Sequence, residues 1–135
     1  MQATISITSA DISVRILGVY GIDEALAAFD AFSWEDELRE AQRVSEQGKD
    51  CVSPDMTFSV SPYHFTATIN ERRSEIDVEV CVPKSGKVLG LVPLTSTKFF
   101  HFKRVSRQRF EELLRAFFSV PQNEQFRWFS QTENV

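Results

Sequence analysis

Two histidines and two cysteines are the side chains of this 135-residue sequence best suited to proton transfer or nucleophilic attack. His64 and Cys81 fall on the outward, polar sides of two neighbouring predicted strands, where an imidazole could activate a thiol. Asp77 and Glu79 precede Cys81 on the same strand, and their charge would raise the pKa of the thiol and disfavour the reactive thiolate. Because no catalytic motif accompanies these residues, we expect a protein that is not an enzyme and has no catalytic residue.

A metal site is the second chemistry to consider, because four carboxylates crowd one predicted helix, namely Glu35, Asp36, Glu37 and Glu40. They lack the spacing of a calcium-binding loop and a paired histidine, which favours a solvated helix face. The cysteines and histidines lack the paired spacing of a zinc site, and the sequence has no glycine-rich phosphate-binding motif. We therefore expect no metal and no cofactor, and we expect Cys51 and Cys81 to be free thiols.

The segment KFFHFKR, residues 98–104, combines aromatic and basic side chains on a predicted strand. Rings that stack on bases, next to cations that follow the phosphates, are what single-stranded nucleic acid requires. The segment lacks the glycines of an RNA-recognition signature, and the net charge of −4 is not that of a basic domain, so nucleic acid is not the favoured partner. The alternative ligand face predicted here consists of Lys98, Phe100, His101, Phe102 and Arg104.

A plainer reading of the same segment is a core strand. In that reading Phe99 packs under one helix, Phe100 and Phe102 face another layer, and the basic residues lie at the rim. The sequence alone leaves these two arrangements open.

Charge is distributed unevenly along the chain. Residues 21–55 contain ten acids and three bases, a net charge of −7, whereas residues 84–115 contain eight bases and two acids, a net charge of +6. Separated charge of this size creates surface potentials that steer partners. The acidic face formed by Glu35, Asp36, Glu37 and Glu40 is expected either to keep the protein in solution or to bind a basic protein. We favour protein binding, and an acidic inhibitor or immunity-type protein that masks a basic partner is one form of it.

Hydrophobic periodicity predicts the strands that position these side chains, at residues 4–9, 11–20, 56–60, 63–69, 76–82 and 95–105, with a short one at 88–92. On the second strand Ile12, Val14 and Ile16 share one face, and Leu17 with Val19 indicates that its far end passes under a helix. Turns are predicted at 61–62, 70–74 and 83–87.

Two helical regions are predicted, one between the second and third strands and one after the last strand. The first begins at Ile22, bends or restarts at Ser33 and ends at Gly48, and the second has Ser106 as its N-cap and ends before Pro121. The order of strands and helices predicts an α+β two-layer sandwich, a mostly antiparallel sheet of five to six strands with two helices packed on one face.

The C-terminal segment, residues 122–135, is polar except for its aromatic side chains, and the possible interface residues here are Phe126, Arg127, Trp128 and Phe129. Large aromatic side chains do not stay fully solvated, so they are expected to dock on the domain's own sheet or to anchor a homodimer or partner. The length fits one α+β domain, residues 1–121, followed by this tail. Because neither a signal peptide nor a membrane-spanning run is evident, we expect a cytoplasmic protein with no membrane partner.

Overall fold

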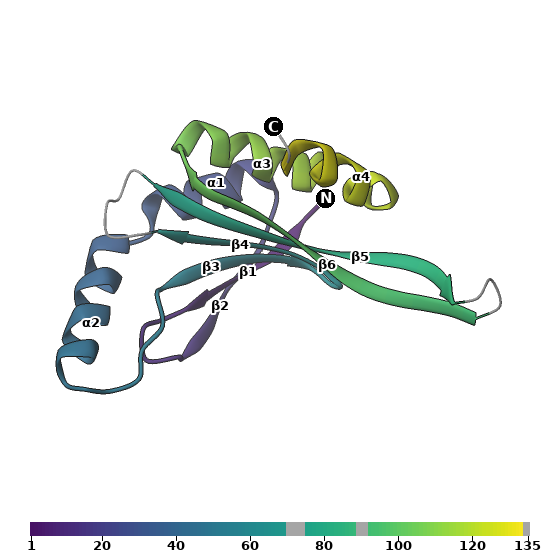
Figure 1. Ribbon diagram of the computed structural model, residues 1–135. Helices are drawn as coiled ribbons and strands as arrows, with labels where there is room; N and C mark the ends of the chain where they lie inside the picture. The colour runs from purple at the N-terminus through teal and green to yellow at the C-terminus, as the bar shows by residue number, and fades with distance from the viewer. Residues whose placement is uncertain (70–74, 89–91, 134–135) are drawn as a thin grey trace.

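A six-stranded antiparallel sheet forms the centre of the protein, in the order β2-β1-β3-β4-β5-β6 (Figure 1). The computed structural model describes residues 1–69, 75–88 and 92–133. The strands are β1 (Ala3–Thr8), β2 (Val14–Tyr20), β3 (Asp55–Val60), β4 (Tyr63–Ile69), β5 (Ile76–Val88) and β6 (Val92–Val105). Every neighbouring pair is antiparallel, which confirms the predicted α+β class with an antiparallel sheet.

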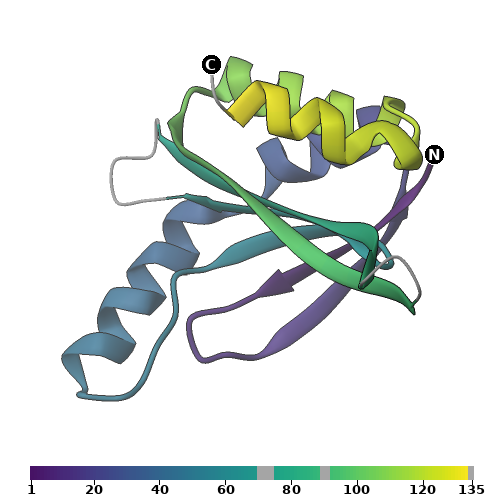
Figure 2. The same ribbon diagram turned by 45° about the vertical axis from the view of Figure 1, so that its right-hand side comes forward.

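The described residues contain four helices, α1 (Ile22–Ala31), α2 (Trp34–Glu46), α3 (Arg107–Ser119) and α4 (Gln122–Glu133). In both ribbon views α1, α3 and α4 lie over one face of the sheet, whereas α2 projects away beside one end of it (Figures 1 and 2). The expectation of two helices on one face is therefore not confirmed. None of the described helices covers the opposite face of the sheet, which is called the open face below.

Local sequence explains where most of these helices begin and end. The break between α1 and α2 falls at Phe32 and Ser33, although the Ser33 side chain makes no capping hydrogen bond. Gly48 follows α2 with a φ of +69°, a conformation in which glycine avoids the steric cost of a side chain. The Ser106 hydroxyl accepts the backbone N–H of Arg109 at 3.1 Å, which confirms the predicted cap of α3.

The hydrophobic core lies between the sheet and the layer of α1, α3 and α4. Alternation along the strands buries one side of each strand, so that Ile5, Met56, Phe58 and Val80 are fully enclosed. Phe65 lies at the middle of this layer, with ring centroids at 5.9 Å from Phe58, 6.0 Å from Phe110 and 5.6 Å from Phe117. These aromatic contacts join β3 and β4 to α3.

The C-terminal aromatic segment forms α4 and packs on the sheet. Phe129 is fully buried, with its ring centroid 6.1 Å from that of Phe100 and 6.2 Å from that of Phe102 on β6. Gln125 is also fully buried, and its side-chain amide donates to the carbonyl of Phe117 at 2.9 Å. The described part of this segment, α4, therefore packs on the domain's own sheet.

Two strands differ from the predicted pattern. Residues 83–87 were expected to turn, but β5 continues through them and pairs with β6 as far as Val88. The second strand, β2, begins only at Val14, because Ile12 lies in the preceding turn with a φ of 70°. Val14, Ile16 and Val19 are exposed, so the prediction that the far end of this strand passes under a helix is wrong for Val19. The polar turn predicted at 70–74, and part of the strand predicted at 88–92, lie outside the described residues.

Candidate functional site on the open sheet face

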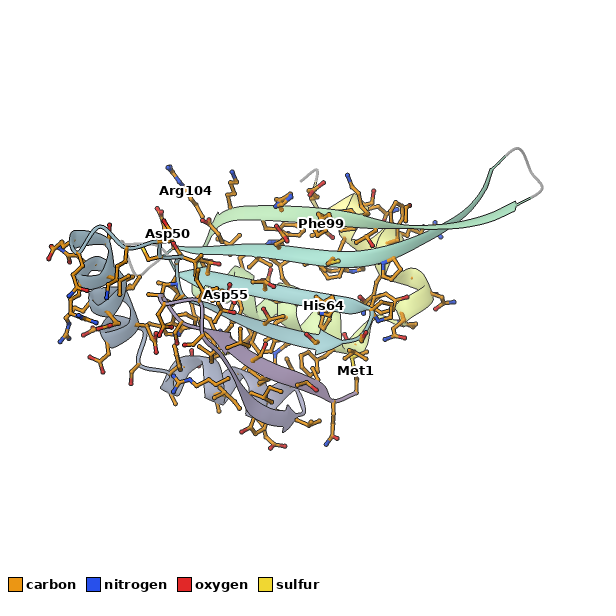
Figure 3. All side chains as sticks on the ribbon, turned by 90° about the horizontal axis from the view of Figure 1, so that it is seen from below. Met1, Asp50, Asp55, His64, Phe99 and Arg104 are labelled. Atoms are coloured by element: carbon orange, nitrogen blue, oxygen red, sulfur yellow. The ribbon has the colours of Figure 1, made fainter. Side chains whose placement is uncertain are left out.

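The open face of the sheet carries rows of side chains that the strand register aligns across neighbouring strands (Figure 3). The row nearest the α2 end contains Thr8, Asp55, Thr68 and Asp77. The middle row contains Ser6, Thr57, Thr66, Glu79 and His101. The third row contains Thr4, Ser59, His64, Cys81 and Phe99. Hydroxyl, carboxylate and imidazole groups of these rows form hydrogen bonds across neighbouring strands, which suits a face exposed to water.

A hollow of about 320 Å³ lies in the first two rows. Its walls come from four neighbouring strands, and they are formed by Asp55, Thr66, Thr68, Asp77, Val78, Glu79, His101 and Lys103. Three carboxylates, one ammonium group and one imidazole therefore converge on one region. This convergence of charged groups on an uncovered sheet face makes the hollow the candidate site.

Asp55 is a half-buried carboxylate of the hollow. Burial raises its pKa above the ordinary value of 3.8, and hydrogen bonds from the hydroxyls of Thr8 and Thr57 offset part of that rise. The hydroxyl of Thr57 donates to Asp55 Oδ1 at 3.5 Å and lies 3.1 Å from the hydroxyl of Thr66. Among the described residues, no cationic side chain forms an ion pair with Asp55. A half-buried carboxylate held only by hydroxyls can accept a cation from outside the chain.

The other two carboxylates of the hollow are fixed by neighbouring groups. Asp77 Oδ1 accepts the backbone N–H of Arg104 at 2.9 Å, where the pairing of β5 with β6 shifts register. Glu79 Oε2 lies 3.4 Å from His101 Nδ1 on the adjacent strand. Each carboxylate is thus oriented by one contact and can offer its other oxygen to a ligand.

The histidine and cysteine expected on one polar face are brought together by the register, because His64 on β4 lies directly opposite Cys81 on β5. The Nδ1 atom of His64 is 2.9 Å from the hydroxyl of Ser59. Burial raises the pKa of the Cys81 thiol, and the charge of Glu79 raises it further. The thiol is therefore kept protonated, which weakens the case for a thiol nucleophile.

The four acids predicted as the partner-binding face lie on α2, away from the hollow, and each lies near an arginine. Arg39 is 3.6 Å from both Glu35 and Asp36, and Arg15 is 3.3 Å from Glu37. Arg43 forms a two-pronged pair with Glu40, and its hydrogen bond lowers the pKa of that carboxyl group. The acidic face is therefore partly neutralised by the chain's own guanidinium groups.

The residues of the predicted alternative ligand face do not share one surface. Phe100 and Phe102 are buried against α4, so they cannot stack on bases, and that part of the prediction is wrong. Lys98 lies over the Phe100 ring at 5.7 Å, and His101 is exposed on the open face. Phe99 is on the open face with 48% of its surface exposed, although the core-strand reading placed it under a helix. The parts of that reading that concern Phe100 and Phe102 are confirmed, and the basic residues Lys98, Lys103 and Arg104 are exposed on the border strand β6.

The predicted C-terminal interface residues are mainly engaged within the chain. The Phe126 ring lies 5.7 Å from the Phe100 ring, and Trp128 contacts Phe129 edge to face at 4.9 Å. Arg127 is exposed. The aromatic side chains of α4 thus close the core over β6.

The sequence did not single out the hollow as a site. On the sequence, Asp55 counts only among the acids of residues 21–55, and Lys103 only among the basic residues of segment 98–104. The available signal was the run of polar residues at every second position of β3, β4 and β5, which is typical of an uncovered sheet face.

In the part of the chain that the structure describes, no helix is both long and apolar enough to cross a membrane. Across residues 1–69, 75–88 and 92–133, no group of three or more His, Cys, Asp or Glu side chains is placed to hold a metal ion. A second hollow, of about 420 Å³, lies where α1 meets α2. Part of its wall is Ile69, the last described residue before residues 70–74.

Comparison with known proteins adds no relative to this picture. No protein-family model, no curated protein and no solved structure matches the chain.

Proposed function

We propose that this chain is a non-enzymatic protein-binding module, and that the hollow on its open face receives a lysine or arginine side chain of a basic protein partner. The observation that carries the proposal is Asp55, a half-buried carboxylate that lines the hollow with two anchored carboxylates and whose partners among the described residues are hydroxyl groups. Masking a basic surface of the partner is the biochemical effect that such binding would have.

The chemistry of the hollow suits a cationic group. An isolated carboxylate loses hydration when it is partly buried, and an incoming cation restores a favourable charge interaction where the effective dielectric constant is below that of water. A guanidinium group can bridge two carboxylates through its fixed N–H groups, whereas an ammonium group acts as a point charge. The hydroxyls of Thr66 and Thr68 supply further hydrogen-bonding groups along the wall.

The acids of α2 have a secondary role in this proposal. Because Glu35, Asp36 and Glu40 are exposed and already near arginines, each contributes little binding energy. Their segment still carries excess negative charge, which attracts a basic protein at a distance and speeds association. We therefore assign anchoring to the hollow and steering to α2.

Two features argue for this class of partner over nucleic acid. The carboxylates of the hollow would repel phosphate groups, and the buried rings of Phe100 and Phe102 are not available to bases. Phe99 is one exposed ring at the border of the face, and one ring does not form a stacking platform.

Binding of an oligo-arginine peptide, measured by isothermal titration calorimetry at two salt concentrations, tests the proposal. The double variant Asp55→Asn with Asp77→Asn removes two charges from the hollow and keeps groups of similar shape. The matched control, Glu35→Gln with Asp36→Asn, removes the same charge from α2. We expect the hollow variant to lose about tenfold in affinity, or about 1.4 kcal/mol, and the control to change less than about twofold. Equal losses in the two variants would show that the peptide responds only to net charge.

A further inference from the structure

The sheet has two borders, and they differ in how their outer edges are protected. β6 forms one border, and its backbone N–H at His101 donates to the carboxylate of Glu133 on α4 at 2.7 Å. The same strand carries Lys98, Lys103 and Arg104, and charges on an edge strand disfavour pairing with another chain. These contacts and charges make the β6 edge around residues 98–104 less suited to pairing with a further strand.

β2 forms the other border, and its one charged residue is Arg15. It pairs with β1 on one side, and no described strand lies on its other side. Val14, Ile16 and Val19 point to the open face with 64%, 71% and 58% of their surface exposed. The strand sequence VRILGVY is rich in residues that favour strands and contains no proline, so an uncovered edge of this kind readily recruits another strand.

We propose that β2 pairs, antiparallel, with β2 of a second copy of this chain, so that two sheets join into one. An antiparallel pair of identical strands is related by a twofold axis, which makes the edge complementary to itself. Pairing would set the apolar stripe of Val14, Ile16 and Val19 beside its own copy on the same face of the joined sheet. The six apolar side chains would then shield one another from water.

The charge of β2 fits a second copy better than a strongly charged partner. Arg15 is the one charged residue of the strand, and its guanidinium lies 3.3 Å from Glu37 and 5.6 Å from the centre of the Phe32 ring. Glu37 therefore balances the charge of Arg15 within the same subunit. Two β2 edges can then approach each other without repulsion between their arginines. A neutral, apolar edge is complementary to another neutral, apolar edge.

The area of the edge sets the strength of the dimer. A seven-residue strand is about 23 Å long at roughly 3.3 Å per residue. One strand edge with three apolar side chains covers less than the about 800 Å² per partner of a standard stable interface. We therefore expect a reversible dimer with a dissociation constant in the micromolar range. Because the hollow is built from β3 to β6, both hollows stay open in this dimer, so its existence does not depend on the proposed function.

Sedimentation of the full chain over a wide concentration range tests this inference. The wild-type protein is expected to shift from monomer to dimer as concentration rises. Ile16→Lys places a charge in the stripe at an exposed position, and it should leave a folded monomer. Phe99→Lys makes a similar change at the opposite border of the same face, and it should dimerise like the wild type.

Hydrogen exchange of the β2 backbone amides gives a second readout, since edge pairing should make their protection rise with concentration. If Ile16→Lys fails to fold by circular dichroism, Val14→Lys takes its place. A wild-type protein that stays monomeric throughout, a lysine variant that dimerises normally, or a dimer without added β2 protection would each overturn the inference.

Discussion

The backbone N–H of Arg104 donates to Asp77 Oδ1 at 2.9 Å, at the point where the register between β5 and β6 shifts. Arg104 has a φ of +57° there, in the left-handed region that costs a residue with a side chain roughly 1 kcal/mol. The Asp77 carboxylate therefore holds a strained corner of β6 while it lines the hollow. The same hydrogen bond fixes the corner and orients one carboxylate of the candidate site.

Replacing Asp77 tests this link. Asp77→Ala should lower the free energy of unfolding by about 1–2 kcal/mol, because the Arg104 N–H loses its acceptor. Asp77→Asn should retain most of the stability, since an amide oxygen can accept the same hydrogen bond. Urea denaturation measures both, with Asp36→Ala on exposed α2 as a control that should cost less than about 0.5 kcal/mol. Equal losses for the alanine and asparagine variants would contradict the role of this hydrogen bond.

The raised pKa of Asp55 predicts a specific dependence of stability on pH. Because burial raises this pKa in the folded state, the folded protein holds the Asp55 proton more tightly than the unfolded chain does. The stabilisation that the folded protein gains from holding this proton is fully present below the ordinary carboxyl pKa of 3.8. It is lost as pH rises through the pKa of Asp55 in the folded state. Asp55→Asn should therefore be more stable than wild type near neutral pH, and the gain should shrink in acid.

Asp11 provides a control of opposite sign for that experiment. Hydrogen bonds from Ser13 lower the pKa of the exposed Asp11 carboxyl group, so its contribution is present at neutral pH and is lost in acid. Asp11→Asn should thus be less stable than wild type near neutral pH. Thermal melts across the acidic and neutral range measure both variants, and a destabilised Asp55→Asn at neutral pH would contradict the assignment of Asp55 as a desolvated carboxylate.

The reactivity of Cys81 tests the electrostatics at the centre of the open face. In a Cys51→Ser background, alkylation of Cys81 should be slow at neutral pH, because burial and Glu79 both raise its pKa. Glu79→Gln should lower that pKa and speed alkylation at a given pH, whereas Glu112→Gln on distant α3 should not. Rates of iodoacetamide labelling measured against pH give the pKa directly. An unchanged rate profile in Glu79→Gln would show that the carboxylate does not act on the thiol.

Docking of α4 predicts unequal roles for two neighbouring aromatic side chains. Phe129 is fully buried against Phe100 and Phe102, so Phe129→Ala should cost about 3–5 kcal/mol of stability. Trp128 is half-buried, and Trp128→Ala should cost clearly less. Chemical denaturation compares the two. A larger loss in Trp128→Ala, or a change in oligomeric state in either variant, would favour the alternative that this segment is an interface.

The sequence predicted the elements whose signals are local. The alternation in β3, β4 and β5, the turn at residues 61–62 and the cap of α3 were predicted because each depends on residues close together in the chain. The helix α4 was not predicted, because Pro121 was taken only as the end of the helix before it. Proline is also tolerated where a helix starts, and α4 begins at the next residue, Gln122. Residues 83–87 have the composition of a turn, yet pairing with β6 outweighs that preference.

The features that decide the candidate site depend on register between distant strands. The run Phe99, Phe100, His101, Phe102 has no alternation of apolar and polar residues, so only pairing with Val78 and Val80 shows which rings are buried. The hollow likewise exists only because four strands align Asp55, Thr66, Asp77 and Lys103. Sequence patterns predict which residues face outward, but they do not predict which outward residues meet.

Chemical-shift mapping of the isotopically labelled protein is the sharpest test of the proposed cation site, because it locates bound cations without prior choice of a surface. The probe is a short oligo-arginine peptide added in steps at moderate salt. A cation site in the hollow predicts that the largest shifts fall on the side chains and amides of Asp55, Asp77, Glu79 and His101, with small shifts along α2. Shifts centred on Glu35, Asp36 and Glu40, with the hollow unperturbed, would contradict it.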